Sequence, residues 1–253
     1  MIDVHSHILR GIDDGARTLE DSLDIAAAAV GDGIVTIAGT PHVRDDWPTE
    51  PELMEERVAE LRAELELVGI PLDVRTGGEI ALDWLTRLTP EELRRFGLGG
   101  SRYLLVETPY YGWPRDLPGL LFSLLDQGFL PVLAHPERNA DVAARPDLLV
   151  PLVEEGVLIQ VTAASVDGRI GRRAFECGRL LIRQGLAHLL ASDAHHASVR
   201  EVGMSDAAKR VGDPALARWL AREVPAAILA DTAIPPRPRS RPAKRWLGRL
   251  LEP

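Results

Sequence analysis

The 253-residue chain has very little cysteine and no excess of basic residues. Its only cysteine, Cys177, cannot form an intrachain disulfide, and it excludes a zinc site built from several cysteines. Lys and Arg total 29 against 38 Asp and Glu, which gives a formal net charge of −9. A general nucleic-acid binder needs a basic surface to displace counterions, so this charge balance argues against that class.

Long apolar runs are also absent. No stretch approaches the roughly 18 apolar residues that a membrane-spanning helix requires, so we expect no transmembrane segment. The start, MIDVHSHIL, lacks a basic segment followed by an apolar core, so we expect no signal peptide and a cytoplasmic location. A hydrophobic fraction of 45% with 26% charged residues is typical of a folded globular protein.

Short apolar runs alternate with longer segments of helical periodicity. The runs are apolar nearly throughout, which is typical of parallel strands that are covered on both faces. Strands are expected at Ile2–His5, Ile34–Ala38, Leu72–Thr76, Tyr103–Glu107, Leu130–Ala134, Leu158–Thr162 and Ala187–Ala191. Helices are expected at Leu19–Val30, Glu52–Val68, Leu117–Gln127, Asp147–Glu155 and Arg169–Gln184. About seven strand–helix units predict an α/β barrel, although an open doubly wound sheet would give a similar pattern.

Two local signals refine this prediction. Thr18 and Asp21 have the spacing of a cap at the start of the first helix, and Thr49 with Glu52 resembles a capping box for the second. From Ile234 the chain becomes proline-rich and basic. We therefore expect one folded domain over 1–233 and a tail over 234–253, which either is a disordered solubilising end or docks on an anionic membrane or a partner.

Histidines and carboxylates cluster where the expected strands end. Residues two apart on an extended chain point the same way, so His5 and His7 can reach one ion. We call such groups of polar residues at strand ends polar stations. The others are Asp13-Asp14-Gly15, Thr40-Pro41-His42, Gly78-Glu79, Glu107, His135-Pro136-Glu137-Arg138 and Ser192-Asp193-Ala194-His195. The desolvation cost of carboxylates in such positions is reversed by a divalent cation, and imidazole with carboxylate ligation suits zinc, manganese or iron.

Each station alone also has a purely structural explanation, such as a satisfied buried pair, a helix cap, a surface charge or a turn. Five of the seven histidines, however, fall at strand ends beside the acids. A structural role for all of them at once is a poor explanation of that coincidence. His188 and His196 remain outside the pattern, and we expect His188 to lie in the core.

The order of the motifs DVHSHIL, DDG, TPHV, GGEI, VETP, HPER and SDAH resembles the polymerase-and-histidinol-phosphatase (PHP) superfamily. Within it, MIDVHSHIL followed by GIDDGARTLEDSL looks like the bacterial CpsB-type tyrosine-phosphatase branch, which is linked to capsule and exopolysaccharide synthesis. The resemblance runs from Met1 to about Ile228. It implies a single-domain, distorted (β/α)7 barrel of the TIM-like PHP type, with a site for three divalent metal ions.

The resemblance also implies a role for each matching residue. The first metal would bind His5, His7, Glu79 and Asp193, the second Glu79, Glu107 and His135, and the third Asp14, His42 and His195. Arg138 and Arg200 match arginines that bind phosphate in the family, and guanidinium groups suit phosphate well. The chain departs from the family at Val43, where a second histidine is frequent, and at Thr162, where relatives usually carry asparagine.

By this resemblance the chain is a metal-dependent phosphatase, most simply with manganese, although iron or zinc is compatible. A hydroxide bridging two metals would attack the phosphorus of a phosphotyrosyl protein, and the implied partner is a bacterial tyrosine kinase of polysaccharide export. The rival enzyme is a histidinol-phosphate or other small-molecule phosphomonoesterase. A rival of another class is a non-catalytic regulator that binds the kinase.

Two further features carry their own alternatives. Cys177 and Arg183 fit the C-x5-R spacing of cysteine-dependent tyrosine phosphatases, but the residues between them have helical periodicity, so we interpret Cys177 as a buried helical residue rather than a nucleophile. Tyr110, Tyr111 and Trp113 follow Glu107 and could form an aromatic rim for a phosphotyrosyl ring or simply pack within their loop.

Overall fold

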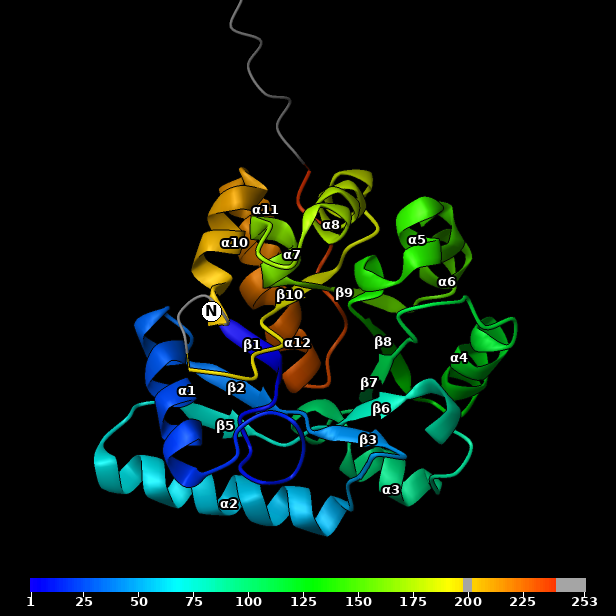
Figure 1. Ribbon diagram of the computed structural model, residues 1–253. Coiled ribbons are helices and arrows are strands. Elements are labelled where there is room, and N and C mark those ends of the chain that lie inside the picture. Colours follow the sequence, from blue (N-terminus) through cyan, green and yellow to red (C-terminus); the bar gives the residue numbers. More distant parts are fainter. Residues whose placement is uncertain (198–201, 240–253) are drawn as a thin grey trace, which may run out of the picture.

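The computed structural model describes residues 1–197 and 202–239 and contains seven parallel strand positions surrounded by helices (Figure 1). The strands are β1 (Ile2–Ser6), β2 (Thr36–Gly39), β3 (His42–Arg44), β5 (Asp73–Arg75), β6 (Glu79–Ala81), β7 (Tyr103–Glu107), β8 (Leu130–Ala134), β9 (Leu158–Thr162) and β10 (Leu189–Ala191). A short strand, β4 (Trp47–Pro48), pairs antiparallel with β3. The expected bounds of β7, β8 and β9 are confirmed.

Two of the seven positions consist of two short strands each. β1 pairs with β2 and β2 with β5, whereas beyond the interruption β3 pairs with β6 and β6 with β7. Thr40 and Pro41 interrupt the strand structure between β2 and β3, and residues 76–78 interrupt it between β5 and β6. The sequence predicted single strands here, and β3 and β6 are additional.

Hydrogen bonds between the first and last positions close the ring. The backbone N–H of Asp193 donates to the carbonyl of His5 at 2.9 Å, and that of His7 donates to Ala194 at 2.8 Å. Ser6 and Ala194 form an isolated parallel bridge between them. With β10, β9, β8, β7 and β6 paired in sequence, the strands form a distorted seven-position barrel. An open doubly wound sheet has no such link between its edges.

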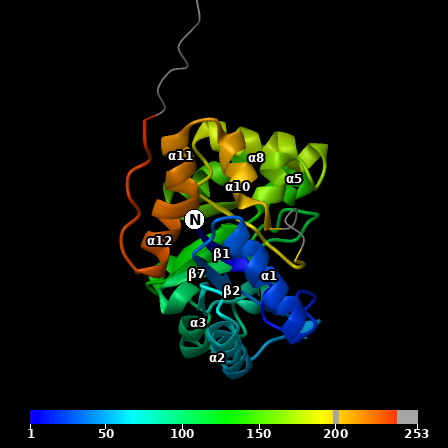
Figure 2. The same ribbon diagram turned by 90° about the vertical axis from the view of Figure 1, so that its left-hand side faces the viewer.

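The helical segments lie outside the strands (Figures 1 and 2). They are α1 (Leu19–Gly31), α2 (Pro51–Val68), η1 (Leu82–Trp84), α3 (Pro90–Arg95), η2 (Leu98–Gly100), α4 (Leu117–Asp126), η3 (Pro136–Arg138), α5 (Ala140–Ala144), η4 (Pro146–Leu149), α6 (Val150–Glu154), α7 (Ala163–Asp167), α8 (Arg172–Gln184), α10 (Met204–Val211), α11 (Pro214–Arg218), η5 (Trp219–Glu223) and α12 (Val224–Leu229). None of the helices in the described ranges is long and apolar enough to cross a membrane.

Several local expectations are corrected by the structure. The helix expected over Arg169–Gln184 begins at Arg172, because Gly171 adopts a φ of 102° that does not continue a helix. Thr49 does not cap α2, since Glu50 occupies the N-cap position and makes no side-chain cap hydrogen bond.

The start of the expected tail lies against the barrel. Pro235 accepts a hydrogen bond from the Trp219 indole at 2.9 Å. The Arg237 guanidinium donates to the carbonyls of Ala187 and Ile182 at 2.8 and 2.7 Å. Figure 2 shows this segment running back along the outside of α12 and α11. The boundary between 233 and 234 stays a prediction, and residues 240–253 lie outside the described part of the chain.

The cap of α1 provides a test of this part of the fold. The Thr18 hydroxyl accepts from the Asp21 N–H at 3.1 Å and the Asp21 carboxylate accepts from the Thr18 N–H at 3.2 Å, which confirms the predicted capping box. We expect Thr18→Ala to lower the free energy of unfolding by about 1 kcal/mol in urea denaturation. Glu50→Ala at the uncapped start of α2 is the control and should change it by less than about 0.5 kcal/mol; equal losses in both variants would contradict the assignment.

Candidate metal centre

The polar stations of the sequence come together at the carboxyl ends of the strands. His5 lies in β1, and His7 follows it. The first residues of β3 and β6 and the last residue of β7 also belong to the site, and further site residues follow the ends of β8 and β10. Four groups of side chains are close enough to hold an ion: His7, Asp14, His42 and His195; His5, His7 and Asp193; His5, Glu79 and His135; His42, Glu79 and Glu107. Every predicted ligand is in at least one group.

His5 of β1 and His7, which follows the strand, face two carboxylates. The Nε2 atom of His5 lies 3.3 Å from Glu79 Oε2 and 3.4 Å from Asp193 Oδ1, and the Nε2 atom of His7 lies 3.4 and 3.3 Å from the same two oxygens. Both nitrogens and Glu79 Oε2 are buried and make no hydrogen bond with described residues. Two ligands at about 2.1 Å from one ion lie roughly 3.0–3.4 Å apart, so this donor set fits a divalent metal.

Glu79 lies at the centre of the whole cluster. Its Oε1 is 2.8 Å from His135 Nε2, and its Oε2 is 2.9 Å from His42 Nδ1. The same His42 nitrogen lies 3.7 Å from Glu107 Oε2. Glu79 therefore touches the histidines of three different strand positions. The structure groups Glu107 with His42 rather than with His135, which differs from the ligand sets expected from the resemblance.

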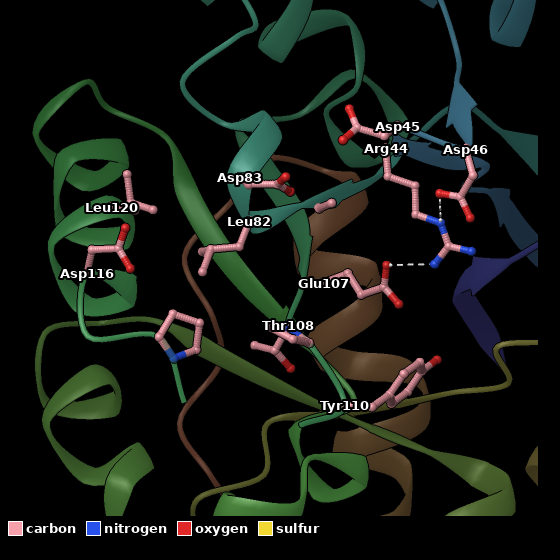
Figure 3. A pocket seen from close by; sticks show the side chains of 13 residues that line it. Arg44, Asp45, Asp46, Leu82, Asp83, Glu107, Thr108, Tyr110, Asp116 and Leu120 are labelled. Atoms are coloured by element: carbon pink, nitrogen blue, oxygen red, sulfur yellow. Dashed lines mark hydrogen bonds and ion pairs between the residues drawn. The ribbon is translucent and has the colours of Figure 1, made fainter. Parts of the chain in front are cut away.

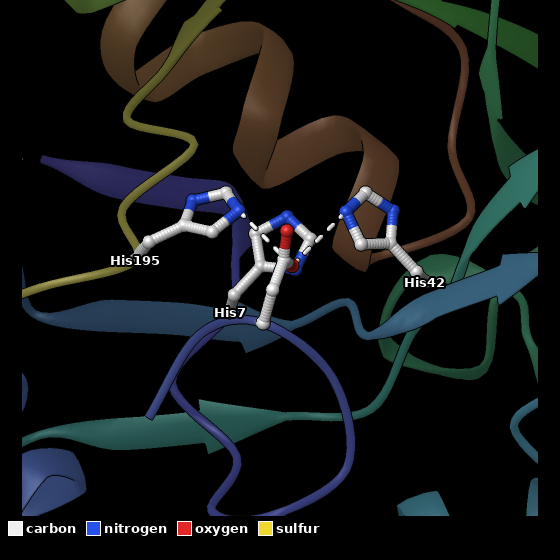
Figure 4. Close-up of side chains that lie close together, drawn as sticks. His7, His42 and His195 are labelled. Carbon is white, nitrogen blue, oxygen red and sulfur yellow. Dashed lines mark ion pairs between the residues drawn. The ribbon is translucent and has the colours of Figure 1, made fainter. Parts of the chain in front are cut away.

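The third expected group surrounds Asp14. Its Oδ1 is 3.3 Å from His42 Nε2 and 3.4 Å from His195 Nε2. His7 stacks on His195 with ring centroids 4.0 Å apart, so the three imidazoles converge on one point (Figure 4). Asp14 and His195 are the more exposed members of the centre, and this side of it therefore faces the solvent.

The electrostatics of the cluster follow from burial and close opposite charges. Burial favours neutral carboxyl groups, but the charge of His5 and the contacts with His135 and His42 hold the pKa of Glu79 well below its usual range. Burial also lowers the pKa of His42, yet Asp14 and Glu79 outweigh it and raise the pKa to about 9. For Glu107, burial and the nearby charge of Glu79 both raise the pKa. Such buried carboxylates need positive charge, which a divalent ion supplies in exchange for the imidazole protons.

Two residues support the histidines of the centre in a way that the sequence did not predict. The Asp13 carboxylate is 2.7 Å from His7 Nδ1 and also accepts from the backbone N–H groups of His42 and Gly15. The Gln160 carbonyl oxygen is 3.1 Å from His5 Nδ1. By occupying Nδ1, each directs the Nε2 atom of its histidine into the centre. The signals were an acid next to Asp14 and an amide within the apolar strand β9.

Close packing and backbone strain also shape the centre. Gly15 lies against His7, where a Cβ atom would come within 2.1 Å of the His7 carbonyl oxygen, so no side chain fits there. His135 and Asp193 have φ values of 33° and 56°, which non-glycine residues rarely adopt. Such conformations are costly and persist only where the surrounding contacts hold them.

Of the two predicted phosphate-binding arginines, only Arg138 lies in the described part of the chain. One guanidinium nitrogen of Arg138 lies 2.5 Å from Asp193 Oδ2, and the group sits over the Tyr110 ring at 4.8 Å. Arg200 lies outside the described residues. Arg44, which was not predicted from the sequence, contacts Glu107 Oε2 at 3.4 Å. Its only sequence signal was its place just after His42.

The remaining candidates are also placed. Cys177 is buried in α8, where burial and then the charge of Glu137 raise the pKa of its thiol to about 12, so it is no thiolate nucleophile. His188 lies just before β10 rather than in it, and its Nδ1 accepts from the Ile159 N–H at 3.1 Å. Tyr110 is nearly parallel to His135 at 6.0 Å, while Tyr111 is 81% exposed.

Comparisons with known proteins find relatives that share the sequence and the fold over most of the chain. A family model described as capsular polysaccharide synthesis, CpsB/CapC, matches residues 1–229. Tyrosine-protein phosphatase YwqE of Bacillus subtilis is 36% identical over 208 residues, 82% of each chain, and putative tyrosine-protein phosphatase CapC of Staphylococcus aureus is 32% identical over 77% of each. A crystal structure from work on YwqE and Streptococcus pneumoniae CpsB, described as metal-dependent tyrosine phosphatases, superposes with a TM-score of 0.82 at 34% identity, covering 95% of this chain and all of that one.

The contact between Asp13 and His7 generates a prediction about metal affinity. Replacing the carboxylate in Asp13→Asn weakens the partner that orients His7, and we expect the affinity for Mn²⁺ to fall about 10- to 100-fold in calorimetric titration. Asp24→Asn, an exposed change of the same kind on α1, is the control and should leave the affinity unchanged. Unaltered affinity in a folded Asp13→Asn protein would show that the contact does not support a metal ligand.

Proposed function

Because the chain belongs to the CpsB/CapC family of capsular polysaccharide synthesis, we propose that it is a metal-dependent protein-tyrosine phosphatase. The observation that carries this proposal is the convergence of buried imidazole nitrogens and carboxylate oxygens, several without hydrogen-bond partners among the described residues, at one end of the barrel. Purely structural histidines would have their ring nitrogens paired.

We propose that the centre holds three divalent ions, with manganese as the expected metal and iron or zinc as compatible ones. The four overlapping side-chain groups support several ions rather than one, and the absence of cysteine from them favours harder metals. The proposed ligands are His5, His7, Asp14, His42, Glu79, Glu107, His135, Asp193 and His195. Bound divalent ions supply Lewis-acid stabilisation of the phosphoryl group and a water of lowered pKa as the nucleophile.

The side chains around the ions have distinct proposed tasks. Asp193 holds one nitrogen of Arg138, and the other N–H groups of that guanidinium are available to bind and orient phosphate oxygens. Arg200 is the second proposed phosphate ligand, by resemblance alone. Tyr110 lies between Arg138 and His135, which supports a role in packing against the ring of the substrate.

A phosphotyrosyl substrate suits this centre chemically. Its leaving group is a phenolate with an ordinary pKa near 10, which needs less proton assistance than an alkoxide. Burial raises the pKa of Tyr110 to about 12, so this phenol stays protonated at neutral pH and can donate a hydrogen bond. The centre can therefore work by holding the phosphate, without a dedicated general acid.

The family description supports a more specific setting. We propose that the phosphoprotein is a bacterial tyrosine kinase that governs polysaccharide export, and that the encounter takes place in the cytoplasm, where ATP-dependent kinases act. A non-catalytic regulator would not need to retain the ligands, yet every expected ligand is present in the described ranges and takes part in a group.

The substrate class can be tested directly. We expect the Mn²⁺-reconstituted protein to release phosphate from a phosphotyrosyl peptide much faster than from histidinol phosphate, and EDTA to abolish the release. The Cys177→Ser variant should keep this activity, because the thiol is buried and protonated. Preference for histidinol phosphate would overturn the assignment, and loss of activity in Cys177→Ser without unfolding would contradict the metal-based mechanism.

The role of Arg138 gives a second test. Lysine keeps the charge at this position but loses the planar pair of donors, so we expect Arg138→Lys to lower kcat/KM for a phosphotyrosyl peptide about 100-fold. Arg145→Lys, at an exposed position after α5, is the matched control and should behave as the unmodified protein. Similar activity of the two variants would remove Arg138 from the phosphate site.

A further inference from the structure

A cavity of about 410 Å³ opens beside the metal centre, between the ends of β3, β6 and β7 and the start of α4 (Figure 3). Glu107 and Tyr110 line the cavity, and both also contact the histidines of the centre. The cavity therefore adjoins the centre and shares Glu107 with it. Its volume is at the lower end of the range for small-ligand sites, which suits one or two side chains rather than a protein surface.

The wall of this cavity is apolar. Leu82 is buried, and Leu120 of α4 lies across from it in Figure 3; Ala81 and Pro114 complete the apolar lining. None of these side chains offers a polar atom. The wall therefore suits the methylene groups of a long side chain rather than a phosphate or a carboxylate.

The rim of the cavity is acidic, with exposed carboxylates at Asp45, Asp46, Asp83 and Asp116. Arg87 contacts both Asp45 and Asp83, at 2.5 and 3.4 Å, and is their common partner. Three of these four carboxylates are thus paired with two guanidinium groups, those of Arg87 and Arg44.

The pairing partner of Asp46 is Arg44, at 3.0 Å, and Arg44 also contacts Glu107. Asp116 precedes α4, makes no cap hydrogen bond and has no ion pair within residues 1–197 and 202–239. In Figure 3 its carboxylate lies beside Leu120 at the opposite side of the cavity from Arg44. The side of the cavity formed by α4 therefore carries uncompensated negative charge.

The cavity on the other side of Tyr110 has the opposite charge. It measures about 520 Å³, and three arginines, Arg138, Arg172 and Arg173, line it against one carboxyl group, that of Glu137. A basic residue of a bound peptide is therefore attracted to only one of the two cavities that flank Tyr110.

We propose that the cavity between β3, β6, β7 and α4 binds the side chain next to phosphotyrosine in the peptide substrate and selects lysine or arginine there. The inference rests on the proposed function, because it places the phosphotyrosine at the metal centre. A basic side chain satisfies both features of the cavity: its methylene stem covers the apolar wall and its charged end meets the acidic rim.

Binding of phosphonate peptides tests this proposal without requiring turnover. Phosphonodifluoromethyl-phenylalanine replaces phosphotyrosine in peptides that carry Lys, Gln or Glu at the position immediately before it or immediately after it. Fluorescence anisotropy with the Mn²⁺-loaded protein should show, at one of the two positions, about fivefold tighter binding of the Lys peptide than of the Gln peptide at low salt. The difference should shrink at high salt, because exposed charges are screened.

Two variants locate the preference. In Asp116→Asn the advantage of the Lys peptide should largely disappear, whereas hydrolysis of p-nitrophenyl phosphate should be unchanged, because Asp116 is no part of the catalytic machinery. Asp126→Asn, at the other end of α4 and outside the cavity, is the matched control and should keep the full preference.

The other outcomes of these binding experiments also decide whether the cavity selects a basic side chain. Equal binding of all peptides, a preference for Glu at both positions, absence of binding, or a Lys preference that survives in Asp116→Asn would overturn the proposal. Failure of the proposed function has a different signature, since a Lys preference in binding with no hydrolysis of any phosphotyrosyl peptide would leave the cavity's role in place and remove the phosphatase assignment.

Discussion

The site depends on a carboxylate that is fully buried among imidazoles. Glu79 has no access to solvent, and its two oxygens face nitrogens from β1, β3 and the end of β8. A buried carboxylate is very costly unless positive charge surrounds it, so the closure of the barrel around this group requires the histidines and the cations they can bind. Two residues of the centre also have strained backbone conformations: His135, whose Nε2 contacts Glu79, and Asp193, whose Oδ1 faces His5 and His7.

A second layer of contacts fixes the imidazoles that face Glu79. Asp13 and Gln160 hold the outer nitrogens of His7 and His5, and Gln160 also accepts from the backbone N–H of His135. Gln160 therefore connects the first strand position with the fifth across the interior. The geometry of the metal centre is set by this buried network as much as by the ligands themselves.

Much of this arrangement was predictable from the sequence. Strands such as β7, β8 and β9 are short apolar runs with clear ends, and the polar residues that follow them were recognised because parallel strands end at one edge. The breaks at Thr40-Pro41 and at residues 76–78 were not predicted, since β3 and β6 are only three residues long and lack periodicity. The helices after residue 203 also went unrecognised.

The sequence could not show which side chains of the site touch one another in the folded chain. Arg44, Asp13 and Gln160 are ordinary residues in their segments, and only the closed ring shows that they touch the ligands. The proximity of Glu107 to His42 is likewise visible only in the folded chain. The proposed ligand roles remain predictions, whereas the proximity of the side chains is a property of the fold.

The interrupted strands have a consequence for how the barrel can change over evolutionary time. β2 hydrogen-bonds with β1 and with β5 in one sheet, while His42 and Glu79 belong to β3 and β6, which pair in the other. No continuous ladder joins the two halves at these positions. Substitutions that shift β5 therefore reach Glu79 through residues 76–78. Those that shift β2 reach His42 through residues 40–41 and His5 through the pairing with β1, so short connections transmit changes at the base of the barrel to His42 and Glu79.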